Sequence, residues 1–339
     1  MDKVVGVLGG GQLGRMLLQA ASPLAIPVVS LDPDSSAPAK QVAQPQLLPL
    51  EGNEGEQALR HLDGKFTDAK MIRQLADQAD VLTVEIEHVD VEALAEVAKE
   101  LANKGGRSGN GVKVYPSPEV IALIQDKFTQ KERLAEAGVP VANFCKISAF
   151  SSGGTSSSRD VRDSLVDSVR EAGDRFGYPL MLKSRRLAYD GRGNYVLKSD
   201  SDKDIAEALR ALIPDSSIQH SNDVGERLYA EQMASFEKEV AVMVVRGADG
   251  TTRCFPAVET IHKDSICHVV YAPVRPPRRA DTGLGAKQCG NDPFAGTDLA
   301  QLAQDVAQGA IDKLGQGAVG VFGVEMFLMA SGASHPAHL

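Results

Sequence analysis

The first third of the chain alternates short apolar runs with segments of helical periodicity. The apolar runs predict strands at Val4–Leu8, Val28–Leu31 and Val81–Glu85. Between them, the spacing of apolar residues predicts helices at about Leu13–Ala21 and Ala69–Gln78. Strands that alternate with helices are typical of a parallel sheet covered on both faces. The pattern therefore predicts a Rossmann-like α/β domain at the start of the chain.

This N-terminal pattern ends at a helix start near residue 118. An extended segment at Val112–Tyr115 leads into Ser117-Pro118-Glu119, where a serine cap precedes a proline at the first helical position. A helical pattern continues from there to Ala137, with a break near Gln125-Asp126. We therefore expect the first domain to span residues 1–118.

After residue 118 the pattern changes in kind. The expected strands are Pro179–Lys183, Tyr195–Lys198, Leu228–Gln232, Glu239–Arg246, Thr252–Val258 and Val319–Met329. Helices are expected at about Asp202–Leu212 and Asp298–Leu314. Asp249-Gly250 separates two of the strands and indicates an antiparallel hairpin, because glycine adopts positive φ without strain. We expect an α+β domain over residues 119–329, with the Ser- and Gly-rich segment 151–158 as a surface loop.

The composition of the 339 residues is that of a globular protein, with 43% hydrophobic and 24% charged residues. The net charge of −9 disfavours a general nucleic-acid binder, which needs a basic surface. The 4 cysteines form no C-x-x-C pair, so neither a zinc ribbon nor a disulfide framework is indicated. The longest apolar stretch, Gly317–Ala333, is shorter than the roughly 20 residues that span a bilayer. We therefore expect a cytoplasmic protein without nucleic-acid or membrane partners.

A glycine-rich turn follows the first predicted strand. Gly9-Gly10-Gly11-Gln12-Leu13-Gly14 fits G-x-G-x-x-G, and Asp32 ends the next strand at the separation typical of dinucleotide-binding folds. Taken alone, these features indicate an NAD-dependent oxidoreductase. The same turn also suits any phosphate monoester, and its glycines suit close packing of strand and helix. The turn by itself leaves these three interpretations open.

Two later segments carry charges in unusual places. Lys183 ends an apolar strand, and Arg185, Arg186 and Arg192 follow it in a glycine-containing loop. Cations and flexible backbone amides suit a lid over polyphosphate, whereas a solvated basic hairpin would leave Lys183 without a partner. Glu325 lies in the middle of an apolar strand, where it either faces water or binds Mg²⁺ together with nucleotide oxygens.

Five motifs occur in the order found in the ATP-grasp enzymes of purine synthesis. They are Gly9–Met16, Gln125–Lys131, Tyr189–Gly193, Glu231-Gln232 and Val324–Phe327. The chain resembles the N5-carboxyaminoimidazole ribonucleotide synthases of this superfamily, in particular the N-terminal module of fungal phosphoribosylaminoimidazole carboxylase. The resemblance covers residues 1 to about 329 and implies a pre-ATP-grasp domain followed by an ATP-grasp domain.

The resemblance also implies an activity. It is the ligation of bicarbonate to 5-aminoimidazole ribonucleotide at the expense of ATP, through carboxyphosphate, with Mg²⁺ as cofactor. This reaction belongs to purine biosynthesis, and the resemblance further implies a homodimer.

Site residues carry over by matching motif. Lys127 and Lys183 would contact ATP phosphates, Glu231 the adenine and Glu239 the ribose. The full set of implied ATP contacts is Lys127, Lys183, Ala188, Gly191, Gly193, Asn194, Glu231, Gln232, Met233, Ala234, Glu239 and His262. The implied catalytic residues are Tyr189, Asp190 and Arg192, the metal ligand is Glu325, and the substrate-binding residues are Gly11, Gln12, Leu13 and Glu85.

The residues alone leave other interpretations open. Glu231 and Glu239 also fit ion pairs with basic neighbours across strands, and His262 also fits a turn histidine. In the family, an Asn-Glu pair with a second Mg²⁺ ligand follows the strand that bears Glu325. Residues 330–339 contain no such pair, so we expect an incomplete ATP-grasp domain and a tail of unrelated sequence. The alternatives to an active synthase are a catalytically impaired nucleotide-binding form and the oxidoreductase.

Overall fold

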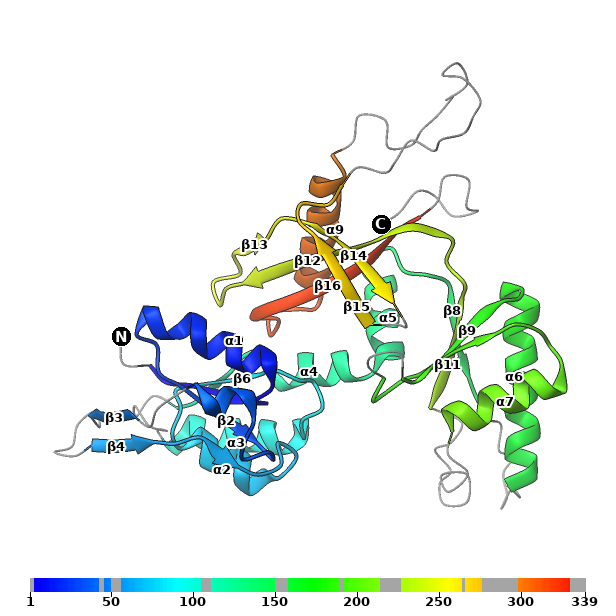
Figure 1. The fold of residues 1–339 in the computed structure, drawn as a ribbon. Helices are drawn as coiled ribbons and strands as arrows, with labels where there is room; N and C mark the ends of the chain where they lie inside the picture. The colour runs from blue at the N-terminus through cyan, green and yellow to red at the C-terminus, as the bar shows by residue number, and fades with distance from the viewer. Residues whose placement is uncertain are drawn as a thin grey trace. The chain divides into compact units, whose positions relative to one another are not determined.

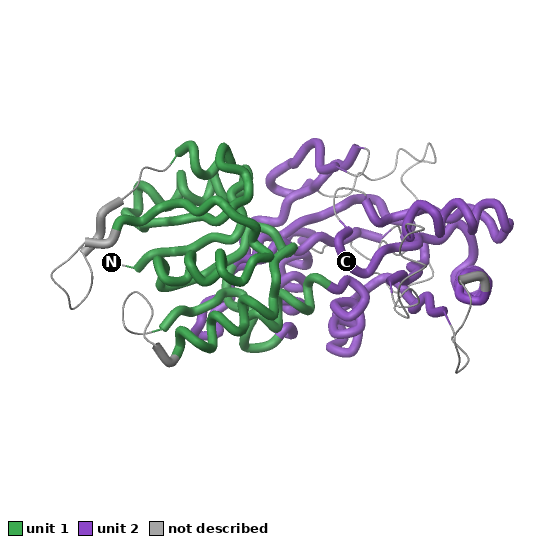
Figure 2. Tube along the Cα trace, turned by 90° about the horizontal axis from the view of Figure 1, so that it is seen from below, with its two compact units in different colours: residues 1–125, 315–320 green, residues 126–314, 321–339 purple. Residues whose placement is uncertain are grey.

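The computed structural model describes residues 3–42, 46–49, 56–104, 111–149, 158–188, 192–213, 227–263, 266–275 and 298–329. They belong to two compact units (Figure 2): residues 1–125 with 315–320, and residues 126–314 with 321–339. The first unit extends past residue 118 to Gln125, because helix α4 (Pro118–Gln125) contacts helix α3 (Val91–Lys104) of that unit.

The first unit contains a five-stranded parallel sheet in the order β5-β2-β1-β6-β7. Figure 1 labels two of its strands, β2 and β6, together with helices α1, α2 and α3 of the same unit. Its strands are β1 (Val5–Leu8), β2 (Val28–Asp32), β5 (Leu62–Asp63), β6 (Val81–Val84) and β7 (Lys113–Val114). Besides α3 and α4, its helices are α1 (Gln12–Ala21), α2 (Ala69–Ala76) and the short η1 (Ser22–Leu24) and η2 (Pro38–Gln41). A two-stranded hairpin, β3 (Gln46–Pro49) and β4 (Glu56–Leu59), forms a separate sheet. The predicted Rossmann-like fold is confirmed.

The second unit begins with helix α5 (Lys127–Glu136) and a four-stranded antiparallel sheet in the order β10-β9-β11-β8. The strands are β8 (Phe144–Ile147), β9 (Leu180–Ser184), β10 (Asn194–Leu197) and β11 (Leu228–Gln232). Alternate residues of β9 and β11, including Leu182 and Ala230, join one buried core with helices α6 (Ser158–Phe176) and α7 (Asp202–Leu212). The intervening residues, including Lys183 and Glu231, therefore point to the opposite face.

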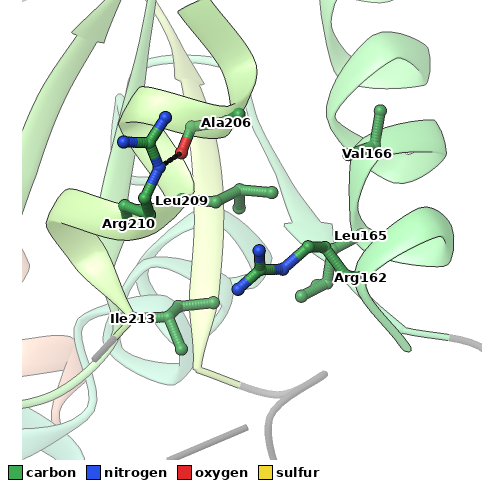
Figure 3. Close-up of a pocket in the computed structure, with 7 residues that line it drawn as sticks. All are labelled: Arg162, Leu165, Val166, Ala206, Leu209, Arg210 and Ile213. Carbon is green, nitrogen blue, oxygen red and sulfur yellow. Dashed lines mark hydrogen bonds between the residues drawn. The ribbon is translucent and has the colours of Figure 1, made fainter. Parts of the chain in front are cut away.

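A small pocket lies between α6 and α7 (Figure 3). Leu165 and Val166 line it from α6, and Leu209 and Ile213 line it from α7 and the residue that follows. Because these helices cover the apolar face of the sheet, the pocket lies on the side away from Lys183 and Glu231.

The second sheet of this unit has the order β13-β12-β14-β15, and β16 also pairs with β12. Its strands are β12 (Phe236–Arg246), β13 (Thr252–Cys254), β14 (Val258–Lys263), β15 (Ile266–Tyr271) and β16 (Gly320–Met329). Helix α9 (Leu299–Lys313) contacts β12 and β13. Gly250 has φ +82° between β12 and β13, which confirms the predicted hairpin.

The structure adds elements to the predicted set. The elements that the sequence did not predict are helices α3 and α6, the short η1 and η2, and strands β3, β4, β5, β8 and β15. The strand expected at Thr252–Val258 is divided, because β13 ends at Cys254 and β14 begins at Val258. Residues 151–157 of the loop expected at 151–158, and the tail expected at 330–339, lie outside the described residues, whereas Ser158 is already the first residue of α6. Within the part of the chain that is described, no helix is both long and apolar enough to cross a membrane.

Glu259 is a buried carboxylate of the second sheet with two cationic partners. Arg275 donates from Nε and Nη2 to its two oxygens at 3.0 and 2.9 Å, and Lys238 Nζ lies 2.9 Å from Oε2. The Arg275 guanidinium also lies 3.7 Å from the ring centre of Tyr271. The hydrogen bonds from Arg275, together with Lys238, outweigh the effect of burial and lower the pKa of Glu259 from 4.5 to about 2.

We expect Glu259 to make stability depend on pH. A lowered pKa contributes stability that is fully present above the ordinary value of 4.5 and is lost as the pH falls toward 2. The contribution is at most about 3 kcal/mol, because solvent around the half-exposed Arg275 screens the pair. Urea unfolding of the wild type and of Glu259→Gln at several pH values between 7 and about 3 measures the effect.

The difference in unfolding free energy between these two proteins should shrink as the pH falls. Glu237→Gln is the matched control, because Glu237 is an exposed carboxylate on β12. A difference between the wild type and Glu259→Gln that is constant over this pH range would contradict the prediction.

Candidate active site

A buried carboxylate joins two lysines on the polar face of the first sheet of the second unit. Lys183 Nζ on β9 lies 3.0 Å from Glu231 Oε2 on β11, and Lys131 Nζ on α5 lies 3.1 Å from Oε1. The Glu231 side chain is 9% exposed, whereas those of Lys183 and Lys131 are 26% and 21% exposed. Each carboxylate oxygen thus has its own cation, and both cations reach the surface.

The charges of this cluster depend on one another. Burial opposes ionisation of Glu231, but Lys131 and Lys183 together outweigh it and hold the pKa of the carboxyl below its ordinary value. Tyr229, two residues earlier on the same face, is buried beside this negative charge, and both effects raise the pKa of its hydroxyl. Glu231 is therefore an anion, and Tyr229 is a neutral neighbour.

The start of α5 is fastened to the end of β9. Asp126 caps the helix by accepting from Thr129 N–H, and its two oxygens accept from Arg185 Nε and Nη2 at 3.1 and 2.8 Å. Lys127 N–H also donates to the Arg185 carbonyl at 2.8 Å. These bonds fix the backbone of Lys127 beside that of Arg185, two residues after Lys183.

The predicted lid lies between β9 and β10. Ser184 N–H donates to the Gly193 carbonyl at 2.7 Å, and Asn194 pairs with Lys183 across the two strands. Gly193 has φ +79°, a conformation that favours glycine. Ala188 and Arg192 lie at the two ends of this loop, and Tyr189, Asp190 and Gly191 lie outside the described residues.

The predicted adenine contacts begin in β11 and continue into the connection between the two sheets. Gln232 N–H donates to the Asn143 carbonyl at 2.9 Å, and Asn143 Nδ2 donates to Gln232 Oε1 at 2.9 Å. Met233 and Ala234 follow directly and lead to Phe236, the first residue of β12. The connection is therefore anchored where it leaves β11.

The predicted ribose and metal residues lie on the second sheet. His262 Nδ1 on β14 contacts the Glu239 carboxylate on β12. Glu239 and Met243 share one face of β12, and Met243 Sδ approaches Gly323 of β16. By alternation, Glu325 shares this face with Gly323 and is exposed on it.

The Glu325 carboxylate suits a metal ion that binds together with a nucleotide. Among the residues that the structure describes, no group of three or more His, Cys, Asp or Glu side chains is arranged to hold a metal. Mg²⁺ usually binds through one or two carboxylates together with phosphate oxygens, rather than in an all-protein cage. The exposed Glu325 fits this chemistry.

The glycine turn of the first unit is built around two carboxylates. Gly10 N–H donates to Asp32 Oδ2 at 2.8 Å, and Gly14 N–H donates to Glu85 Oε1 at 3.2 Å. Gly9 has φ +110°, and a Cβ at that position would lie 2.4 Å from Glu85 Oε2. Asp32 therefore stabilises the turn itself, which weakens the oxidoreductase interpretation, and Glu85 lies directly against the turn.

The structure thus brings the predicted residues together in three groups. The first group is Lys183 with Glu231, and the second is Glu239 with His262. The third, in the first unit, is Glu85 with the Gly9–Gly14 turn, which contains Gly11, Gln12 and Leu13.

Sequence reasoning missed two contacts of this site. They are the pair Asp126–Arg185 and the contact of Lys131 with Glu231. Lys131 is the last residue of the Gln125–Lys131 motif, but no feature of the sequence predicts that it contacts Glu231.

Two family models match the two parts of the chain. The ribonucleotide synthetase preATP-grasp domain matches residues 1–125, and the ATP-grasp domain matches residues 132–284. Phosphoribosylaminoimidazole carboxylase of Ogataea methanolica is 43% identical over 98% of this chain and 48% of its own length. N5-carboxyaminoimidazole ribonucleotide synthase of Synechococcus elongatus is 32% identical over 83% of this chain and 58% of its own length. The chain thus spans about half the length of the curated relatives it matches.

Solved structures agree with these relatives. The crystal structure of carboxyaminoimidazole ribonucleotide synthase from Aspergillus clavatus complexed with ATP has a TM-score of 0.69 and 38% identity, over 97% of this chain and 67% of that chain. A second structure from this organism, in complex with ADP and 5-aminoimidazole ribonucleotide, has a TM-score of 0.67 and 37% identity, over 97% of this chain and 66% of that chain. The chain belongs to the carboxyaminoimidazole ribonucleotide synthase family of ATP-grasp proteins.

Proposed function

We propose that this chain carries the synthase module that attaches bicarbonate to 5-aminoimidazole ribonucleotide with ATP. The observation that carries the proposal is the cluster of Lys183, Glu231 and Lys131, which presents two cations around one buried anion. In a chain of net charge −9, such a local excess of positive charge suits a polyphosphate. The relatives bound to ATP, or to ADP and 5-aminoimidazole ribonucleotide, support the same assignment.

The proposed reaction has two transfers. A bicarbonate oxygen attacks the γ-phosphorus of ATP, so that carboxyphosphate forms and ADP leaves. The amine of the aminoimidazole then attacks the carboxyl carbon, phosphate leaves, and the amine loses a proton. Both the nucleotide and bicarbonate are anionic, so fixed cations stabilise the charge that develops on the transferred group.

In the proposal, different residues of the second unit bind the phosphates, the adenine and the ribose of ATP. Lys127 and Lys183 bind phosphates, residues Glu231–Ala234 bind the adenine, and Glu239 and His262 bind the ribose. Mg²⁺ held by Glu325 and the nucleotide would neutralise phosphate charge. The loop 188–194, with Tyr189, Asp190 and Arg192 as the proposed catalytic residues, closes over the phosphates and excludes water, because carboxyphosphate hydrolyses in an open site.

In the first unit, the glycine turn and Glu85 bind 5-aminoimidazole ribonucleotide in the proposal. The turn opens helix α1, whose first N–H groups suit a phosphate or a ribose hydroxyl. Gly11, Gln12 and Leu13 lie at this helix start, and Gln12 and Leu13 are exposed. We also propose a homodimer, which the resemblance implies, and a cytoplasmic location, which the composition of the sequence led us to expect.

A second candidate is a nucleotide-binding form that does not turn over. Glu325 is the one carboxylate of β16, and the described residues offer no cluster of three metal ligands, so other Mg²⁺ contacts would have to come from the nucleotide. Such a form binds ADP as the synthase does, so only turnover separates the two candidates.

We expect phosphate release that depends on both co-substrates. The protein is mixed with ATP and Mg²⁺, and released phosphate is followed with bicarbonate, with 5-aminoimidazole ribonucleotide, with both and with neither. Release that requires both supports the synthase. ADP binding without such release supports the nucleotide-binding form, and the absence of ADP binding contradicts both.

Removal of the Lys183 ammonium should weaken nucleotide binding. Because a contact between a half-buried ammonium and a phosphate is charge-assisted, we expect Lys183→Ala to lower the affinity for MgADP by roughly tenfold to a hundredfold. Isothermal titration calorimetry measures the affinity. Lys198→Ala is the matched control, because Lys198 is exposed just after β10 on the same sheet. Equal affinities of the wild type and Lys183→Ala would refute the assignment of Lys183.

A further inference from the structure

The proposed reaction assigns Lys131 no contact with a substrate, yet Lys131 occupies a defined place beside Lys183. Its Nζ lies 3.1 Å from Glu231 Oε1, while Lys183 Nζ lies 3.0 Å from Oε2 of the same carboxylate. The two lysines come from different elements, α5 and β9, and meet at Glu231.

The helix that carries Lys131 is held against the sheet by its own side chains. Phe128 packs edge-on against Phe144 of β8, with ring centres 5.5 Å apart, and against Tyr229 of β11, at 5.9 Å. Lys131 is three residues later in α5, and residues at this spacing share one face of a helix. Phe128 therefore directs Lys131 toward the face of the sheet that carries Glu231.

Two cations around one carboxylate produce a different site from a single ion pair. If Glu231 paired with Lys183 alone, the pair would be neutral, and a phosphate would have to compete with Glu231 for the Lys183 ammonium. With Lys131 on the second oxygen, the three side chains carry a net charge of about +1. Lys131 also places a second cation beside Oε1, the carboxylate oxygen opposite the one that Lys183 contacts.

We propose that Lys131 is a positioning residue of the nucleotide site: it holds and partly neutralises Glu231, which leaves the Lys183 ammonium available to a phosphate. This inference rests on the proposed function. It differs from an ordinary structural ion pair, because its effect on nucleotide affinity passes through the charge of Glu231.

The experiment compares substitutions on one helix. MgADP affinity is measured by isothermal titration calorimetry for the wild type, Lys131→Met, Lys131→Arg and Arg133→Met, and thermal unfolding of each variant is recorded. Arg133→Met is the matched control, because it also removes one positive charge from α5, at an exposed position. We expect Lys131→Met to bind MgADP roughly tenfold more weakly, Lys131→Arg to recover most of this loss, and Arg133→Met to bind as the wild type does.

A second background tests whether Lys131 acts through Glu231. Lys131→Met is combined with Glu231→Gln, and the double variant is compared with Glu231→Gln alone. Glu231→Gln removes the buried negative charge, so the double variant leaves no unpaired buried anion and can be measured even if Lys131→Met alone fails to fold. In this background the effect of Lys131→Met should fall to less than about threefold, because no anion remains to be held.

The outcomes separate the inference from the function on which it rests. A wild type that binds no MgADP would overturn both. A wild type that binds, with equal affinity in Lys131→Met, would overturn the role of Lys131 alone. An effect of Lys131→Met that is equally large with and without the Glu231→Gln substitution would also overturn it, because Lys131 would then act independently of Glu231.

Discussion

The candidate site depends on a carboxylate that is buried and remains charged. Glu231 is only 7% exposed, and an isolated anion at that position would be strongly destabilised. Lys131 and Lys183 offset this penalty, and in doing so they are themselves held in place on the polar face of the sheet. The arrangement links the chemistry of the site to the packing of α5, since Lys131 and Phe128 approach the sheet from the same helix.

Much of the fold could be predicted from the sequence, because periodicity reports which residues face a core. Alternation placed β9, β11 and β12 close to their observed bounds, and Asp249-Gly250 located the hairpin that joins β12 to β13. Helix α6 was missed, although Val161, Leu165, Val169 and Ala172 show a helical spacing, because many charged residues separate them. Strand β15 was missed because its side chains are mostly exposed on both faces, so no alternation marks it.

The site was harder to predict than the fold, because its groups meet through tertiary structure. Lys183 and Glu231 could be selected from motifs, and the possibility that Glu231 pairs with a basic neighbour was open from the sequence. The bidentate contact of Arg185 with Asp126 could not be predicted from the sequence, since 59 positions separate the two residues. Lys131 and Glu231 are still farther apart along the chain. The glycine turn was recognised, but only the bond from Gly10 to Asp32 shows that this acid supports the turn.

The central claim, that two lysines share one charged carboxylate, is tested most directly by the pKa of Glu231 in the folded protein. It is measured by ¹³C NMR of glutamate labelled at the side-chain carboxyl, with the Glu231 signal assigned by its loss in Glu231→Gln. We predict a midpoint below the ordinary value of 4.5, because Lys131 and Lys183 stabilise the anion, and a higher midpoint in Lys131→Met. A midpoint at or above 4.5 in the wild type would contradict the claim.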